Sequence, residues 1–315
     1  MASYGSTTYT DPDDFRARVS SAVVNLVLTG SEPFKARVTW LKQRRLTLVS
    51  AEQTTSHITF LSFDPARVYV SFPLRGEAVM NGMRVRRGDF VIHGRGERVH
   101  HLAEACTCWG MISMRARELA ACGRALLGQE LLLPDTSRLV RPSGKTTGRI
   151  LRLHAQACRL AASRPDMMAN QEVARAVEHE LMVILVDLLA SKKGRVGDAA
   201  DRRHVEIMGR FQEALAGQHH AQHVSALCAA IGVPQRTLRK CCAAFLAHSP
   251  VAYIQLRRLN LARSALCKAD HETARVADIA RIHGFFEPRR FAGAYRAVFG
   301  ETPSATLLRN SAESA

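Results

Sequence analysis

The chain has 315 residues, of which 47% are hydrophobic, and it carries a formal net charge of +16. This length is sufficient for two domains, each with a hydrophobic core of its own. The N-terminus reads MASYGSTTYTDPDDF, without a basic and then apolar signal segment, and no apolar run reaches the roughly 18 residues that a membrane span needs. These features exclude a membrane-spanning protein, and we expect a soluble cytoplasmic one.

Short segments rich in Val, Ile, Phe and Thr alternate with turn residues between about Phe34 and Met114. They are LTLVS, HITFLSF, VYVSFPL, MRVRRGDFVIHG and CTCWGMISM. The pair Asn81-Gly82 is a strong signal for a two-residue hairpin turn, and Arg87–Asp89 marks a second break. Many short strands at this spacing predict an antiparallel barrel or a double-sheet jelly roll.

A cluster of possible metal ligands lies in this region, comprising His93, Glu97, His100 and His101. Metal-dependent cupin enzymes space two histidines one residue apart, whereas His100 and His101 are adjacent and point to opposite faces of a strand. We therefore expect no metal site, and surface or hydrogen-bonding histidines instead. A small-molecule pocket at the barrel mouth is a better prediction, since an eight-stranded barrel can hold one small ligand. The alternative is a barrel that has no ligand.

Helical spacing of apolar residues begins after Met114, in ARELAACGRALLG, GRILRLHAQACRLAAS and NQEVARAVEHELMVILVDLLASKK. The last segment carries a wide apolar stripe. A stripe of this width covers the barrel, a partner helix or both, so core packing and a homodimer are both compatible with it. The polar, glycine-containing segment Ser191–Ala200 predicts an interdomain linker. The stripe consists of Val173, Val177, Leu181, Ile184, Leu185 and Leu188, broadened by Val183 and Leu189.

One pattern occurs twice, as Val224-x-x-Leu227-Cys228-x-x-Ile231-Gly232-Val233 and as Val276-x-x-Ile279-Ala280-x-x-His283-Gly284-Phe285. In each copy apolar residues mark one helix face, a glycine follows, and an arginine-rich amphipathic stretch comes next. Helix, glycine turn and helix form a helix-turn-helix unit, because glycine adopts a backbone geometry that a β-carbon disfavours. The alternative is a helical repeat protein, which usually needs three or more copies.

Between the two copies, the segment Val251–Ala269 has no glycine or proline and predicts one helix of about 19 residues, roughly 28 Å long. Successive major grooves on one face of B-DNA are about 34 Å apart, so this helix can hold two recognition helices over neighbouring turns. From Pro234 to Arg296 there are 12 lysines and arginines against 4 acidic residues, which suits phosphate neutralisation. We expect double-stranded DNA as the partner; a generally basic surface is the alternative reason for the charge.

The eight cysteines show neither a C-x-x-C pair nor zinc-finger spacing. Several occupy apolar helical positions, where a free cysteine behaves as a small hydrophobic residue. We expect eight reduced thiols, with redox sensing by Cys106 and Cys108 as the alternative.

The run from His204 to about Arg309 resembles the DNA-binding domain of AraC/XylS-type transcription regulators. Its tail, GFFEPRRFAGAYRAVFGETPSATL, is similar in particular to the ethanolamine-operon regulator branch. The piece Arg87–Gly96 resembles the turn region of the cupin-like effector domains that precede this DNA-binding domain. The matching residues are Arg236-Thr237-Leu238, Ser249-Pro250-x-x-Tyr253, Arg258-Leu259-x-x-Ala262-Arg263, Asp278-Ile279-Ala280-x-x-x-Gly284-Phe285, Phe291, Phe299-Gly300 and Thr302-Pro303.

This resemblance implies an α+β fold, with an N-terminal cupin-like β-barrel or jelly roll, flanking helices, and a C-terminal all-α domain of two helix-turn-helix units joined by a long helix. Residues 16–190 are expected to form the effector and dimerisation domain, 191–203 the linker and 204–311 the DNA-binding domain.

The same resemblance implies a transcription regulator without a cofactor that contacts RNA polymerase and responds to a small-molecule effector, and not an enzyme. Activation and repression both stay open. The alternatives are a metal-dependent cupin-type enzyme fused to a DNA-binding domain, and an effector-independent DNA binder.

Four positions depart from the family pattern. Pro234 occupies the place of a serine cap, and proline suits a first helical turn but provides no side-chain cap. Cys242 replaces a core phenylalanine and Ala247 a glycine, so the local packing must differ. Gly293 stands where the family often has an arginine that points at bases. We therefore expect the second unit to read bases less strictly than the first.

The expected DNA-binding residues lie on the second helix of each unit. Arginine can bind guanine with two hydrogen bonds, whereas lysine often binds phosphate, so we expect base reading by the first unit and phosphate contacts by the second. A solvated helix face is the alternative for each arginine. The residues are Gln235, Arg236, Arg239 and Lys240 in the first unit, and Pro288, Arg289, Arg290 and Arg296 in the second.

Overall fold

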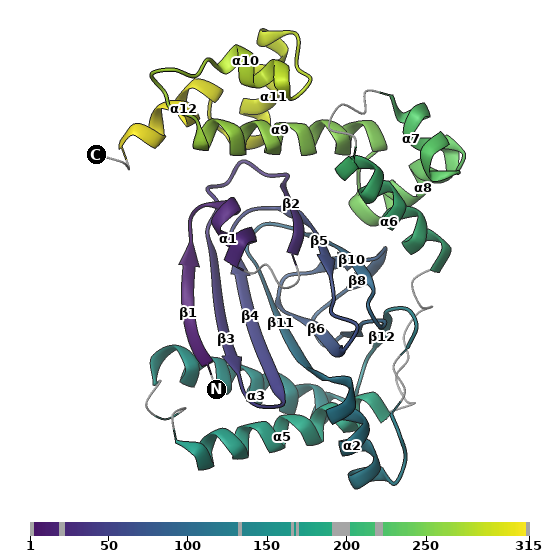
Figure 1. The fold of residues 1–315 in the computed structure, drawn as a ribbon. Coiled ribbons are helices and arrows are strands. Elements are labelled where there is room, and N and C mark those ends of the chain that lie inside the picture. The colour runs from purple at the N-terminus through teal and green to yellow at the C-terminus, as the bar shows by residue number, and fades with distance from the viewer. Residues whose placement is uncertain are drawn as a thin grey trace.

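The computed structural model describes residues 3–18, 23–131, 134–164, 167, 170–190, 202–217 and 223–312. The fold is α+β, as expected. Two antiparallel sheets form the N-terminal part, helices cover one side of it, and an all-helical C-terminal part lies on the other side (Figure 1). Within the described ranges, no helix combines the length and the apolar character that crossing a bilayer requires.

The strands form a seven-stranded sheet in the order β1-β3-β4-β11-β6-β9-β12 and a five-stranded sheet in the order β2-β5-β10-β7-β8. All the strand pairs are antiparallel, which agrees with the predicted barrel or jelly roll. The strands are β1 (Ser3–Tyr9), β2 (Val23–Leu28), β3 (Ala36–Lys42), β4 (Leu46–Gln53), β5 (His57–Ser62), β6 (Arg67–Arg75), β7 (Ala78–Met80), β8 (Met83–Val85), β9 (Phe90–Ile92), β10 (Arg98–Ala103), β11 (Thr107–Arg115) and β12 (Arg138–Val140).

The predicted hairpin turn at Asn81-Gly82 is confirmed. Met80 pairs with Met83, and the two residues between them have φ values of 48° and 79°. Positive φ at both central residues is the geometry of a type I′ turn, which suits the twist of a hairpin. At the second break, the Asp89 amide donates to the Arg86 carbonyl (2.9 Å), which closes a turn between β8 and β9.

The outer face of the seven-stranded sheet is covered by α2 (Ala116–Leu127), α3 (Gly144–Ser163) and α5 (Gln171–Ala190) (Figure 1). The apolar stripe of α5 packs into this core, with Leu181 and Leu185 each 1% exposed. The stripe was compatible with core packing on the barrel and with a homodimer contact, and these residues pack on the barrel. A homodimer stays a prediction.

Two strands precede the region in which strands were expected. β1 is an edge strand that pairs with β3, and β2 is the edge strand of the smaller sheet. A short helix, α1 (Pro12–Arg18), lies between β1 and β2 in the chain. The predicted linker Ser191–Ala200 lies outside the described residues, and the domain boundaries at 16, 190 and 204 stay predictions.

The C-terminal part contains the predicted pair of helix-turn-helix units and the long helix between them. The helices are α6 (Arg202–Gly217), α7 (Val224–Ile231), α8 (Gln235–Leu246), α9 (Pro250–Lys268), α10 (Val276–Ile282), α11 (Pro288–Phe299) and α12 (Pro303–Ala312). The linking helix α9 has 19 residues and begins one residue earlier than expected. Ser249 caps it, because its Oγ accepts from the Ala252 amide (3.2 Å) and Pro250 suits the first turn.

The five-stranded sheet packs directly against the C-terminal helices. Val27 and Ile58 belong to the same buried cluster as Phe211 of α6 and Leu246 of α8. Polar contacts also cross this junction, where Gln212 Nε2 donates to His100 Nε2 (3.2 Å). The barrel therefore lies between α3 and α5 on one side and the helix-turn-helix units on the other (Figure 1).

Candidate DNA interface

The first helix-turn-helix unit turns at Gly232, which ends α7 in the left-handed region (φ 68°, ψ 39°). This positive φ is why glycine suits the position. Pro234 is the N-cap of α8 and has no side-chain cap, as the sequence predicted. Its carbonyl nevertheless accepts from the Thr237 and Leu238 amides (3.0 and 3.1 Å), so the first turn of α8 is closed by backbone bonds.

Helix α8 has a buried face and an exposed face. Leu238, Cys241 and Cys242 are each 0% exposed and pack into the core of the unit. Cys242 thus fills the place of the family's phenylalanine, and burial raises its pKa to about 12, which keeps the thiol protonated. The opposite face carries the expected DNA-binding side chains, all exposed: Gln235, Arg236, Arg239 and Lys240.

The second unit repeats the arrangement. Gly284 has φ +82°, and Phe291 and Tyr295 of α11 are buried. Tyr295 Oη lies 2.8 Å from Thr306 Oγ1, which fastens α11 to α12. The expected contact residues of this unit are again exposed: Pro288, Arg289, Arg290 and Arg296. That either set binds DNA stays a prediction.

Two features of α11 affect the contacts that it can make with DNA bases. Arg290 Nη1 lies 3.2 Å from Glu287 Oε1, so this arginine has an ion-pair partner that the sequence analysis did not assign. Their three-residue spacing at the start of a helix was the available signal. Gly293 is exposed, and a β-carbon there would meet no atom within 4 Å. A β-carbon therefore fits this position without a clash.

The histidines of the barrel are buried, so the expectation of surface histidines is wrong. His93, His100 and His101 are 1–3% exposed, and burial lowers the pKa of each to about 3. Hydrogen bonding, the other part of that expectation, does hold for His93, whose Nε2 is 2.8 Å from Ser71 Oγ. His100 and His101 are buried because both faces of the five-stranded sheet are covered, one by the opposite sheet and one by the C-terminal helices, and His93, which follows β9 of the larger sheet, packs against Phe63.

Glu97, which the sequence analysis grouped with these histidines, has a structural role. Its carboxylate accepts from the Gly94 and Ser137 amides (3.0 and 2.8 Å) and from Asn81 Nδ2 (3.0 Å). Burial raises its pKa, opposed by these hydrogen bonds. In the part of the chain that the structure describes, no three His, Cys, Asp or Glu side chains gather closely enough to hold a metal ion.

Other polar groups face the space between the two sheets. The rings of His57 and His101 are 5.8 Å apart, and those of His101 and Trp109 are 6.1 Å apart. Buried atoms without a hydrogen-bond partner lie along these strands: Gln53 Oε1, His57 Nε2, Thr107 Oγ1 and Trp109 Nε1. His57 Nδ1 bonds the Thr55 carbonyl (2.8 Å), which leaves Nε2 as an acceptor. Both donors and acceptors are thus unpartnered here.

A groove of about 690 Å³ opens on the same face of the larger sheet. Val38 pairs with Ala51 and Ala51 with Trp109, so these residues share the inner face. Trp40 and Lys42 lie in the groove with Arg18 of α1. The groove lies at the β1 edge of that sheet, beside α1, and the small-molecule pocket at the barrel mouth stays a prediction.

A helix-turn-helix domain model matches residues 227–309. XylDLEGF operon transcriptional activator 1 of Pseudomonas putida is 41% identical over 61 residues, which are 19% of this chain and 18% of that protein. The probable thc operon regulatory protein of Rhodococcus erythropolis is 34% identical over 91 residues, which are 28% and 27% of the two chains. The C-terminal domain is of the AraC/XylS type.

The matches place the AraC/XylS-type domain on α7 to α12, where both units and their linking helix lie. The matched segments span less than a third of either relative. Among solved structures, the AraC-like transcriptional activator CuxR is 16% identical, with a TM-score of 0.46 over 82% of this chain and 94% of that one.

Proposed function

We propose that this protein is a sequence-specific, DNA-binding transcription regulator of the cytoplasm that has RNA polymerase as a partner. The observation that carries the proposal is the pair of exposed recognition helices joined by the 19-residue α9. A helix of that length is roughly 28 Å long, close to the distance of about 34 Å between successive major grooves. Both units can therefore bind one face of the same duplex.

The two units differ in the chemistry that they present. α8 exposes Arg236 and Arg239, which can bind guanine with paired hydrogen bonds. On α11, Glu287 pairs with Arg290 and Gly293 has no side chain to offer. We therefore propose that α8 reads bases and that α11 mainly positions the phosphate backbone.

The barrel is the proposed effector domain. Its interior presents unpartnered donors and acceptors, and its buried histidines have lowered pKa values and are neutral at physiological pH. An uncharged polar molecule that both donates and accepts hydrogen bonds suits this interior, and the groove beside Trp40 is the proposed entrance.

We propose a regulator and not an enzyme. A metal-dependent cupin needs convergent ligands, whereas His101 faces the interior and His100 contacts Gln212 on the other side of the sheet. Elemental analysis of the purified protein tests this point. A stoichiometric bound metal that survives dialysis would favour the enzyme.

The central experiment maps the sites that the full-length protein occupies across its genome and selects binding sequences from random DNA in vitro. We expect one recurrent motif in both data sets. A protein that binds random DNA as tightly as the selected motif would contradict sequence-specific regulation. Light scattering with and without the selected DNA tests the predicted homodimer.

A further inference from the structure

A cleft of about 530 Å³ lies at the junction between the barrel and the second helix-turn-helix unit. One wall consists of Thr10, Asp11 and the segment after β2, from Gly30 to Phe34. The other wall consists of α9, the end of α11 and residues Thr306 and Arg309 of α12. A volume of this size is within the usual range for small-molecule sites, which also occur preferentially between domains.

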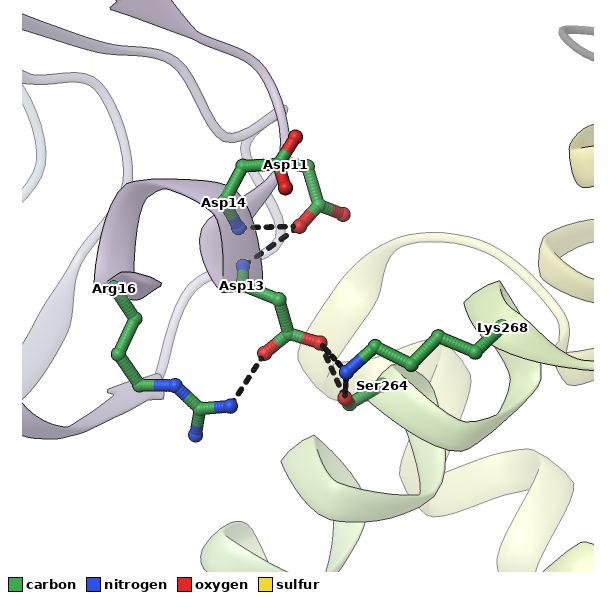
Figure 2. A network of polar contacts seen from close by, with 6 residues as sticks. All are labelled: Asp11, Asp13, Asp14, Arg16, Ser264 and Lys268. Atoms are coloured by element: carbon green, nitrogen blue, oxygen red, sulfur yellow. Dashed lines mark hydrogen bonds and ion pairs between the residues drawn. The ribbon is translucent and has the colours of Figure 1, made fainter. Parts of the chain in front are cut away.

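Polar contacts beside the cleft hold the two walls together. Asn260 of α9 binds the backbone of Leu28 twice: its Oδ1 accepts from the Leu28 amide (2.8 Å) and its Nδ2 donates to the Leu28 carbonyl (3.0 Å). Asp13 of α1 accepts from Ser264 Oγ and lies 2.9 Å from Lys268 Nζ (Figure 2). The cleft is therefore formed before any ligand binds.

The two walls present opposite charges. On α9, the Arg263 guanidinium lies 5.6 Å from the centre of the Phe299 ring, and among the described residues no carboxylate forms an ion pair with it. On the barrel wall, Glu32 is exposed, and the described part of the chain gives its carboxylate no cation partner. Arg309, by contrast, is already paired with Glu301 (2.9 Å).

We propose that this cleft binds a small zwitterion, with its anionic group on Arg263 and its ammonium group on Glu32. A ligand with only negative charge would face Glu32 and Asp11, and one with only positive charge would face Arg263. A molecule that carries both charges satisfies both walls. Phe299 and Phe34 provide apolar contact for the carbon skeleton between its ends.

Such a ligand would connect the barrel to the second helix-turn-helix unit, because its two charged ends bind different parts of the chain. Binding would stabilise the docked arrangement. Only this regulatory consequence depends on the proposed function; the binding site itself does not. The site is also separate from the groove beside Trp40, which has a different lining.

The test is calorimetric titration of the full-length protein, without DNA, with α-, β- and γ-amino acids. Each amino acid is compared with the amine and the carboxylic acid of the same carbon skeleton. We expect at least one amino acid to bind. Its amine and carboxylic acid analogues should each bind at least about tenfold more weakly, since each lacks a charge-assisted contact. The same amino acid should slow alkylation of Cys267, a half-buried thiol in the cleft, as measured by peptide mass spectrometry.

Glu32→Gln and Arg263→Met should each weaken binding about tenfold or more. Glu104→Gln, at an exposed glutamate of another loop, is the matched control and should bind as the wild type does. Because Glu32 is exposed, its variant keeps the test valid even if Arg263→Met fails to fold. Absence of binding by every amino acid, or unchanged binding by Glu32→Gln, overturns the proposal. DNA affinity is measured separately on the ligand-free protein. A failure of DNA binding, which would contradict the proposed function, is therefore distinguished from a failure of amino-acid binding.

Discussion

His100 and His101 are neighbours on β10 but contact different parts of the molecule. The His101 ring lies 6.1 Å from that of Trp109 inside the barrel, whereas His100 Nε2 accepts from Gln212 Nε2 of α6 at 3.2 Å. One strand thus contributes adjacent side chains to the proposed effector site and to the packing of the first helix-turn-helix unit. Both histidines are uncharged in this arrangement, which has a consequence for stability.

Acidification should destabilise the protein. Burial lowers the pKa of His93, His100 and His101 to about 3 and that of His154 to about 4, against about 6.5 in the unfolded chain. The unfolded state therefore binds more protons below pH 6.5, and stability falls as the pH decreases from there towards 4. Each histidine should cost roughly 1–2 kcal/mol at pH 5.5. Urea unfolding at pH 7.5, 6.5 and 5.5 measures this, and a flat profile would contradict it.

Arg239→Ala and Arg296→Ala should behave differently. The first should cost about 1–3 kcal/mol on the selected operator and relax the preference at one base position. The second should weaken binding about equally across sequences and reduce the salt slope by about one unit. Base-substitution and salt titrations distinguish the two, and equal behaviour of both variants argues against the division between base reading and phosphate contact.

Gly293→Arg should raise DNA affinity. The position is exposed, a β-carbon meets nothing within 4 Å, and replacing glycine restores about 1 kcal/mol of helix propensity. The added guanidinium should strengthen binding only to sequences with guanine at the facing position. Selection from random DNA by the wild type is the companion experiment. Equally sharp preferences in both half-sites would refute a degenerate second half-site.

Ala247→Gly should stabilise the protein by about 0.5–1 kcal/mol. Ala247 ends α8 with φ 54°, a left-handed conformation that costs a β-carbon-bearing residue roughly 1–2 kcal/mol, part of which the greater entropy of unfolded glycine offsets. Ala243→Gly, at an exposed interior position of the same helix, is the control and should destabilise by about 1 kcal/mol. Chemical unfolding of both variants tests this, and the prediction fails if both lose stability.

The fragment 201–315 should fold alone and bind DNA, but with lower stability than the full chain. Its two units have cores of their own, whereas Val27 and Ile58 of the barrel complete the core beside α6 and α8. Removing the barrel also leaves Gln212 without His100. Circular dichroism and DNA binding at low salt check this. An unfolded or non-binding fragment would show that the domain division is wrong.

Local patterns were enough to predict the tandem units. Gly232 and Gly284 interrupt periodic apolar segments, and the spacing of the buried residues follows from the 3.6-residue helical repeat. The hairpin at Asn81-Gly82 was also predicted from a local signal, since the turn depends on those two residues. The exposed positions of Arg236 and Arg239 also followed from that periodicity, which assigns a face to each residue of a helix.

The first strand and the burial of the histidines were harder to predict. β1 is an edge strand that pairs with β3, and its polar sequence SYGSTTY lacks the apolar alternation by which a half-buried strand is predicted. His93 and His100 were expected at the surface or in hydrogen bonds, because histidine has no strong preference for the interior. Their burial depends on the opposite sheet and on α6 and α8, which come from distant parts of the chain.

The sequence by itself determined the two helix-turn-helix units, their linking helix and the exposed arginines, because these features depend on residues within a few turns of one another. Only the tertiary structure decided how the barrel meets the DNA-binding domain. Asn260 and Leu28, which exchange two hydrogen bonds, are 232 residues apart, and neither carries a local signal of that pairing. The cleft between Glu32 and Arg263 arises in the same way, since contacts between distant segments follow from packing and not from local periodicity.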